Sequence, residues 1–323
     1  MELVSSEDLA AMGAAELVRV SASIPRAAPR TFALLTACLV WPLSIAVLAH
    51  TLFTDPLDIL LRIHHAQWLR LWAYQFLYLV ALYTFSILST AAAVFTVASL
   101  YANKQPASMS SSLTAMPLIL PRLLHTFACV PLLMGAYHLV FVLTVFGLIN
   151  VCFVPNNDDA PDESPPLPLP FLLCNIVVAA VFVGIHDYVS ALWHLAGVVS
   201  VVEPLCGLAA LAKSKRLLQG RTGTATTLVG AYMTICGVTL LLFRDAVVEG
   251  SFGLALPWRL LVGAALVCVL VCANLLGLLV QSVFYYSCKA FHNQKIDRTE
   301  LYEHLGGYLG ETLKSNILQM ENL

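Results

Sequence analysis

The stretch TFALLTACLVWPLSIAVLAHTLF, from Thr31 to Phe53, contains no Asp, Glu, Lys or Arg. The hydrocarbon core of a bilayer is about 30 Å thick, and a helix of about 20 apolar residues crosses it. Five further apolar stretches follow along the chain. Because lipid offers the backbone no hydrogen-bond partners, each stretch is expected to be a helix. The sequence therefore predicts an all-α fold, a polytopic transmembrane bundle of about six spans.

The overall composition agrees with this fold class. Charged residues make up 11% of the chain and apolar ones 59%, whereas about a quarter of the residues in a typical soluble domain are charged. The net charge of −2 gives no reason to expect a nucleic-acid partner. The first apolar stretch is longer than the core of a signal peptide, so we expect it to remain in the protein.

Three parts are expected along the chain: an amphipathic N-terminal segment over residues 1–30, a membrane domain over residues 31–288, and a tail over residues 289–323. Residues 5–24 carry an imperfect apolar stripe, which predicts a helix lying on the inner leaflet. The six spans are expected at residues 31–53, 72–100, 123–154, 170–190, 226–243 and 257–288.

The basic residues between the spans indicate the orientation. Cytoplasmic segments of membrane proteins carry an excess of Lys and Arg. With a cytosolic N-terminus, only Arg62, Arg70, Arg244 and Arg259 lie on the outer side. The other thirteen of the 17 Lys and Arg residues lie inside. We therefore expect both termini in the cytosol, in the endoplasmic reticulum or the plasma membrane.

Residues 171–212 hold either one span or two, because forty or so mostly apolar residues are long enough for both. A second span would move the basic stretch that follows to the outside, which the charge distribution disfavours. The preferred interpretation is one span ending near Asp187–Ser190, and then a helix on the inner leaflet that reaches Leu218 and carries Trp193, His194 and Glu203.

The basic stretch KSKRLLQGR, from Lys213 to Arg221, follows that helix. Its cations Lys213, Lys215, Arg216 and Arg221 are candidates for contact with anionic lipid headgroups. An ordinary orientation signal is the favoured alternative, because such clusters are what sets topology. Cys288 stands beside Lys289 at the end of the last span, a position suited to S-palmitoylation.

The fifth span contains a stripe of small residues that would allow close helix packing. The sixth span places Asn274 and Gln281 on one face, seven residues apart. We expect the two spans to form an antiparallel hairpin in which Asn274 bonds near Thr227 or Thr234. The alternative, a polar path lined by Asn274 and Gln281, is less favoured. The small-residue stripe comprises Gly223, Thr227, Gly230, Thr234 and Gly237.

Residues suited to chemistry are few. The sequence contains no nucleophile elbow, zinc-protease or P-loop motif, so no enzymatic activity and no cofactor are expected. His186, Ser190 and His194 share a helix face beside Asp187, which allows a metal or proton site. The absence of a third ligand at helical spacing, and an expected place near the inner interface, argue against a metal there.

Two stretches resemble a plant family of six-span membrane proteins without assigned activity. They are LWHLAGVVSVVEPLCGLAALAKSKRLLQGR (Leu192–Arg221) and AFHNQKIDRTELYEHLGGYLGE (Ala290–Glu311), with Ser-Ile-Pro-Arg before the first span. The family often continues after YLGE with Tyr and a Pro-Leu pair, where this chain has Thr312, Leu313 and Lys314. The resemblance implies the fold and a plant source, and it carries no catalytic residues.

Two functions remain open, and the first of them is favoured. The first is a non-enzymatic membrane organiser that recruits cytosolic or membrane partners through its cytosolic segments, including the tail residues Leu301, Tyr302, Leu305, Tyr308 and Leu309. The second is a carrier or channel for a small, weakly charged solute. A cavity at membrane depth lined by Asn175, Asn274 or Gln281 would favour the second, and a packed core would favour the first.

Overall fold

The computed structural model describes residues 6–53, 65–103, 109–153 and 169–294. This part of the chain is 91% helical and has no strand, which confirms the all-α fold. Six of its helical segments are long and apolar enough to cross a membrane: Pro29–Thr51, Trp72–Ala102, Thr114–Ile149, Leu172–Val202, Thr222–Glu249 and Leu256–Phe291. The protein is therefore embedded in a membrane.

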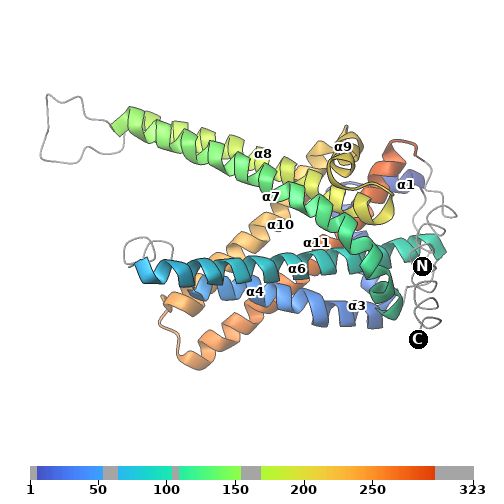
Figure 1. The fold of residues 1–323 in the computed structure, drawn as a ribbon, viewed down its shortest axis with the longest axis horizontal. Coiled ribbons are helices and arrows are strands. Elements are labelled where there is room, and N and C mark those ends of the chain that lie inside the picture. The colour runs from blue at the N-terminus through green and yellow to red at the C-terminus, as the bar shows by residue number, and fades with distance from the viewer. Residues whose placement is uncertain (1–5, 54–64, 104–108, 154–168, 295–323) are drawn as a thin grey trace, which may run out of the picture.

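The helices follow one another as α1 (Ser6–Ala11), α2 (Ala14–Ser23), the 3-10 turn η1 (Ile24–Arg26), α3 (Pro29–Leu35), the π-helical turn η2 (Thr36–Val40), α4 (Trp41–Phe53), α6 (His65–Asn103), α7 (Met109–Phe153), α8 (Leu169–Val202), α9 (Gly207–Leu218), α10 (Thr222–Phe243), the π-helical turn η3 (Arg244–Glu249) and α11 (Leu256–Phe291). In Figure 1, α7 and α8 lie side by side, as do α4 and α6. Helix α10 packs against α8 and α11, and α11 also contacts α4 and α6. Helices α9 and α1 lie at one end of the bundle, which we call the α9 end.

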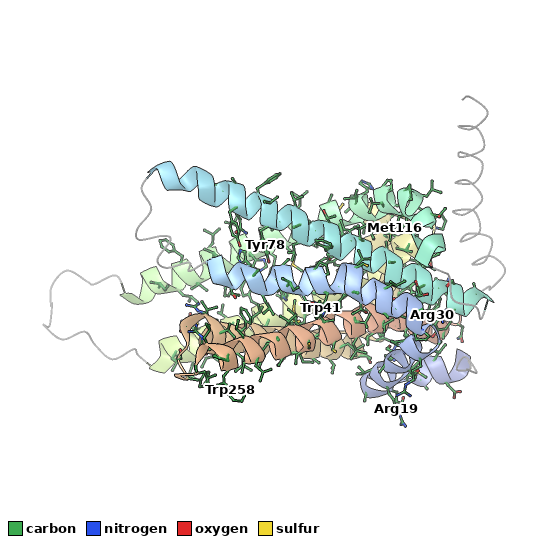
Figure 2. All side chains as sticks on the ribbon, turned by 90° about the horizontal axis from the view of Figure 1, so that it is seen from below. Arg19, Arg30, Trp41, Tyr78, Met116 and Trp258 are labelled. Carbon is green, nitrogen blue, oxygen red and sulfur yellow. The ribbon has the colours of Figure 1, made fainter. Side chains whose placement is uncertain are left out.

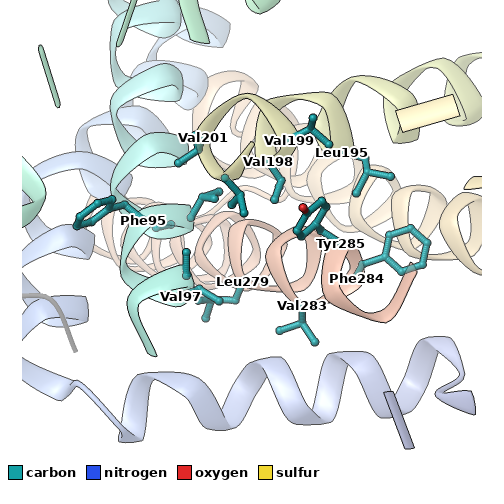
Figure 3. Close-up of a cluster of buried hydrophobic side chains, with 14 of the residues drawn as sticks. Phe95, Val97, Leu195, Val198, Val199, Val201, Leu279, Val283, Phe284 and Tyr285 are labelled. Atoms are coloured by element: carbon teal, nitrogen blue, oxygen red, sulfur yellow. The ribbon is translucent and has the colours of Figure 1, made fainter. Parts of the chain in front are cut away.

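The hydrophobic core lies toward the α9 end. Buried side chains concentrate in residues 91–98 of α6, 195–202 of α8 and 279–290 of α11, and Figure 3 shows part of this cluster. Apolar side chains in the other half are exposed, such as Leu132 on α7 (78%) and Val177 on α8 (62%). Large exposed apolar surfaces of this kind are expected where helices face lipid.

Prolines account for two local features of the spans. Pro42 has no N–H to donate into the helix, and the turn just before it widens into the π-helical η2. Helix α8 continues past Ser190 to Val202 and ends shortly before Pro204, since the residue before a proline disfavours helix. The expected helix break near Ser190 is therefore wrong, and Trp193 and His194 lie on the same helix as the fourth span.

The N-terminal segment also differs from the expected surface helix. It forms two short helices, α1 and α2, and both pack against α11. Leu9 and Leu17 are buried in the main core. Contact with protein, in addition to any contact with the leaflet, therefore holds this segment in place.

Candidate functional site

A cavity of about 130 Å³ lies inside the bundle toward the α9 end, among α6, α8, α10 and α11. A buried water needs roughly 10–15 Å³ of such space, so the cavity has room for several waters or one small molecule. No Asp, Glu, Lys or Arg is among its lining residues. Its polar lining consists of Ser86, Ser89, Thr90, Trp193, His194, Tyr232, Asn274 and Gln281.

A hydrogen bond between His194 and Gln281 joins α8 to α11 at the cavity wall. The His194 Nδ1 and Gln281 Oε1 atoms are 3.1 Å apart. An amide oxygen can only accept, so Nδ1 is the donor in this pair. In the neutral imidazole, Nε2 is then left as an acceptor.

Trp193 also lines the cavity. Its indole Nε1 is buried without a hydrogen-bond partner among the described residues. The indole ring packs edge-on to Phe127, at 5.5 Å between ring centroids, and stacks on His194 at 4.9 Å. An unpaired buried donor is unfavourable by about 1–3 kcal/mol unless a water or ligand accepts its hydrogen bond. A mostly apolar cavity with a few converging polar groups is the usual form of a small-molecule site.

Asn274 ties three helices together beside the cavity. Its Oδ1 accepts a hydrogen bond from Tyr232 Oη at 2.7 Å, and its Nδ2 donates to Ser44 Oγ at 2.9 Å. The expected partners Thr227 and Thr234 are therefore wrong. Their hydroxyls donate to carbonyls four residues earlier in α10, which is a common alternative for threonine within a helix.

The small-residue stripe of α10 does not face α11 as expected. A side chain at Gly230 would lie 3.2 Å from the Asp187 carboxylate on α8, while Gly223 and Gly237 border open space. Helices α10 and α11 do pack together as a hairpin, but through the Tyr232 ring, which lies against Gly277. The rotation of α10 about its axis, which the sequence does not reveal, decides which face meets α11.

Packed apolar side chains surround the α9 end of helices α8 and α11. Val198 and Val199 of α8 and Val283 and Tyr285 of α11 belong to one buried cluster (Figure 3). None of these four side chains is exposed to solvent. We call this cluster the packed layer.

Glu203 fastens the α9 side of this layer. Its Oε1 accepts a hydrogen bond from Tyr285 Oη at 2.5 Å and lies 3.4 Å from Lys289 Nζ. Lys213 Nζ lies 3.9 Å from Oε2, and Arg122 donates to the Glu203 carbonyl at 3.1 Å. The turn between α8 and α9 is thereby held against α7 and α11.

The basic stretch does not present all its cations to lipid. Lys215 and Arg216 are exposed, whereas Lys213 is paired with Glu203. Arg221 is only 6% exposed. It donates to the carbonyls of Ala10 and Met12 and to Ser287 Oγ. The expected headgroup contact of Arg221 is therefore wrong, because its guanidinium is buried and hydrogen-bonded to the N-terminal segment.

The Cys288 side chain is fully buried. Acylation of Cys288 would require the thiol to leave the core of the α9 end. The palmitoylation site expected there is therefore wrong for the folded chain.

His186 and Asp187 lie in the middle of α8 and not at its end. Their Nδ1 and Oδ1 atoms are 3.8 Å apart, and the His186 ring neighbours those of Tyr137 and His138 on α7. Fifteen residues separate Asp187 from the end of α8 at Val202, which corresponds to about 22 Å of helix. Their place near the inner interface stays a prediction. Within the described residues, no group of three His, Cys, Asp or Glu could hold a metal ion.

Two signals in the sequence could have revealed the cavity. Ser44 and Tyr232 are polar groups within apolar stretches, and polar side chains at such positions usually bond across helices. The prediction of a surface helix for His194 depends on a helix break near Ser190, and α8 has no break there. The tail residues proposed for docking lie outside the described residues.

Comparison with known proteins gives a family and no function. Neither the curated proteins nor the solved structures contain a match to this chain. The family described as "Domain of unknown function (DUF8558)" matches residues 57–323, which include five of the six apolar helices in full. The chain therefore belongs to the DUF8558 family.

Proposed function

We propose that this protein is a carrier for a small, weakly charged solute, which binds in the cavity between α6, α8, α10 and α11. The observation that supports this proposal is the chemistry of the lining. The cavity is lined by eight polar side chains, Trp193, His194 and Gln281 among them, and by no charged side chain. A small solute with a hydroxyl or amide group suits such a lining.

A carrier fits better than a channel because the helices around the cavity are tightly packed toward the α9 end. Val199 and Tyr285 of the packed layer are fully buried. Passage through the membrane would require this layer to open while the other half of the bundle closes. Helix α8 is the candidate moving element, since its residues 172–185 are largely exposed and those of 195–202 are packed.

We further propose that the solute is moved without chemical change, because the sequence contains no catalytic motif. The proposed setting is a plant cell, in the endoplasmic reticulum or the plasma membrane, with both termini in the cytosol. The family resemblance supports the source, and the excess of Lys and Arg between spans at the α9 end supports the orientation.

A second candidate function is a membrane organiser that recruits protein partners. The observation in its favour is the exposed basic face of α9, where Lys215 and Arg216 have no partner among the described residues. Such a role needs no solute-accessible cavity, so access to the cavity distinguishes the two functions.

Thiol labelling in liposomes tests access to the cavity. Ser86 lines the cavity, and Val97 lies in the packed core. We expect a membrane-permeant methanethiosulfonate ethylammonium reagent to modify the Ser86→Cys variant and to spare the matched control Val97→Cys. Peptide mass spectrometry separates either site from the native cysteines. Equal resistance of the two variants would refute a hydrated cavity.

Flux measurements then test transport. Proteoliposomes are given glycerol, urea or a small sugar alcohol, and saturable uptake is expected for at least one of these. The Gln281→Leu variant removes the partner of His194 and should abolish that uptake. A labelled cavity without saturable flux would favour the organiser.

A further inference from the structure

A second hollow, independent of the carrier cavity, runs along the outside of the first span. It is a groove of about 630 Å³ beside η1, α3, η2 and α4, with Leu275 of α11 forming part of its wall. Pro29, Ala33, Ala37 and Trp41 line it at spacings of four. The two alanines leave space that larger side chains would fill.

A cation stands at the mouth of this groove. Arg26 lines it, is exposed, and has no hydrogen bond or ion pair with any residue that the structure describes. Arg30 is exposed in the adjoining turn, and Figure 2 places Arg30 at the end of the first span. The mouth is therefore basic, whereas the rest of the groove is almost wholly apolar.

The groove is about as long, measured along the first span, as one leaflet is thick. Twelve residues separate Pro29 from Trp41, which is about 18 Å of helix, and one leaflet contributes about half of the 30 Å hydrocarbon core. Trp41 therefore lies near the middle of the membrane, part way along the bundle in Figure 2. Tryptophan prefers the interfaces, yet this side chain is 45% exposed. A ring exposed at that depth provides a flat contact for the end of an acyl chain.

We propose that this groove is a binding site for an anionic glycerophospholipid of the leaflet at the α9 end. The lipid phosphate pairs with the Arg26 guanidinium, whose planar donors suit phosphate. One acyl chain lies over Ala33 and Ala37 and ends against Trp41. An anionic headgroup is favoured over a zwitterionic one because Arg26 and Arg30 both add positive charge at the mouth.

The test measures quenching of Trp41 fluorescence in the full-length protein. The protein is reconstituted with increasing fractions of phosphatidylglycerol or phosphatidylcholine that carries brominated acyl chains. The Trp41 signal is the difference between the wild type and the Trp41→Phe variant. We expect half-quenching at a fraction of phosphatidylglycerol about fivefold lower than of phosphatidylcholine, as one interfacial cation implies.

Single-site variants locate the effect. Arg26→Gln should remove most of the preference and leave only the contribution of Arg30, and Arg26→Lys should retain the preference because it keeps the charge. The matched control Arg19→Gln changes an exposed arginine outside the groove lining, and it should leave the preference unchanged. Ala37→Leu should weaken quenching by both lipids, because it fills the groove.

Several outcomes would overturn the proposal. Equal quenching of the wild type by the two lipids would show that the groove takes any acyl chain. A preference that is undiminished in Arg26→Gln, or that falls equally in Arg19→Gln, would show that diffuse charge is responsible. Circular dichroism of each variant confirms that the helices are intact, and none of these results depends on solute transport.

Discussion

Replacement of Arg221 by alanine is expected to release α1 and α2 from the membrane domain. The guanidinium joins the start of α10 to the N-terminal segment through the carbonyls of Ala10 and Met12. It also bonds to Ser287 Oγ at 2.6 Å and lies 5.8 Å from the ring centre of Phe284. The alanine variant leaves two carbonyls that had faced a buried cation.

The magnitude follows from these contacts. A hydrogen bond to a charged group contributes about 1.5–3 kcal/mol, and a buried carbonyl left without a donor is destabilising by about 1–3 kcal/mol. Ser287 Oγ still donates to the Leu9 carbonyl at 2.6 Å, so part of the docking remains. We therefore expect a loss of about 3 kcal/mol, at the upper end of these ranges, which is roughly a hundredfold change in the opening equilibrium.

Hydrogen–deuterium exchange of the protein in lipid nanodiscs measures this opening. Amides of α1 and α2 should exchange about a hundredfold faster in Arg221→Ala, while amides in the middle of α8 should not change. The control Arg19→Ala removes an exposed arginine of α2 and should change exchange little. Unchanged protection of α1 and α2 in Arg221→Ala would show that apolar packing alone holds the segment, and our reasoning would be wrong.

Three further predictions concern single sites. Asn274→Leu should lower thermal stability by about 1–2 kcal/mol, within the range for hydrogen bonds between membrane helices; an unchanged melting temperature would contradict this. Gly207→Ala should destabilise by about 1 kcal/mol or more, because φ is +59° and a Cβ would lie 2.9 Å from the His125 ring. The control Gly13→Ala borders open space and should be neutral in the same melting assay. N-ethylmaleimide should modify the half-buried Cys206 in the turn between α8 and α9 and spare the buried Cys288 in the folded protein, which peptide mass spectrometry would show; equal labelling would contradict the packing at the α9 end.

The fold class could be predicted from the sequence because it rests on length and polarity alone. A stretch such as residues 31–53 has no stable alternative to a helix in lipid. The end of the fourth span could not be placed in the same way. Polar residues at His186 and Asp187 resemble an interface, yet neighbouring helices surround them within the bundle. Helix α8 ends only at Val202, shortly before Pro204, because the residue before a proline disfavours the helical conformation.

The cavity was harder to predict than the fold because it depends on helix rotation. Asn274 and Gln281 are correctly placed on one face of α11, and both line the cavity. Their hydrogen-bond partners lie on α8, α10 and α4. The rotation of each of these helices about its axis decides which of its side chains meets Asn274 or Gln281. Thr227, Thr234 and Tyr232 are equally plausible partners from spacing alone.

The role of Arg221 was missed for a different reason. Counting charges treats each cation as facing water or lipid headgroups, and it takes no account of a partner far along the chain. Ala10 lies more than 200 residues from Arg221, at a hydrogen-bond distance of 3.1 Å. The atoms that bond Arg221 there are backbone carbonyls, so no side chain in α1 or α2 marks the contact.

The carrier cavity and the lipid groove share one wall, the start of α4 and its contact with α11. On α4, Leu43 lines the cavity and Trp41 lines the groove. On α11, Asn274 lines the cavity and its neighbour Leu275 lines the groove. The Ser44–Asn274 hydrogen bond holds this wall together. The π-helical turn η2 directly precedes it, and π-helical turns often occur at functional sites. Any displacement of α4 at this turn therefore alters the cavity and the groove together.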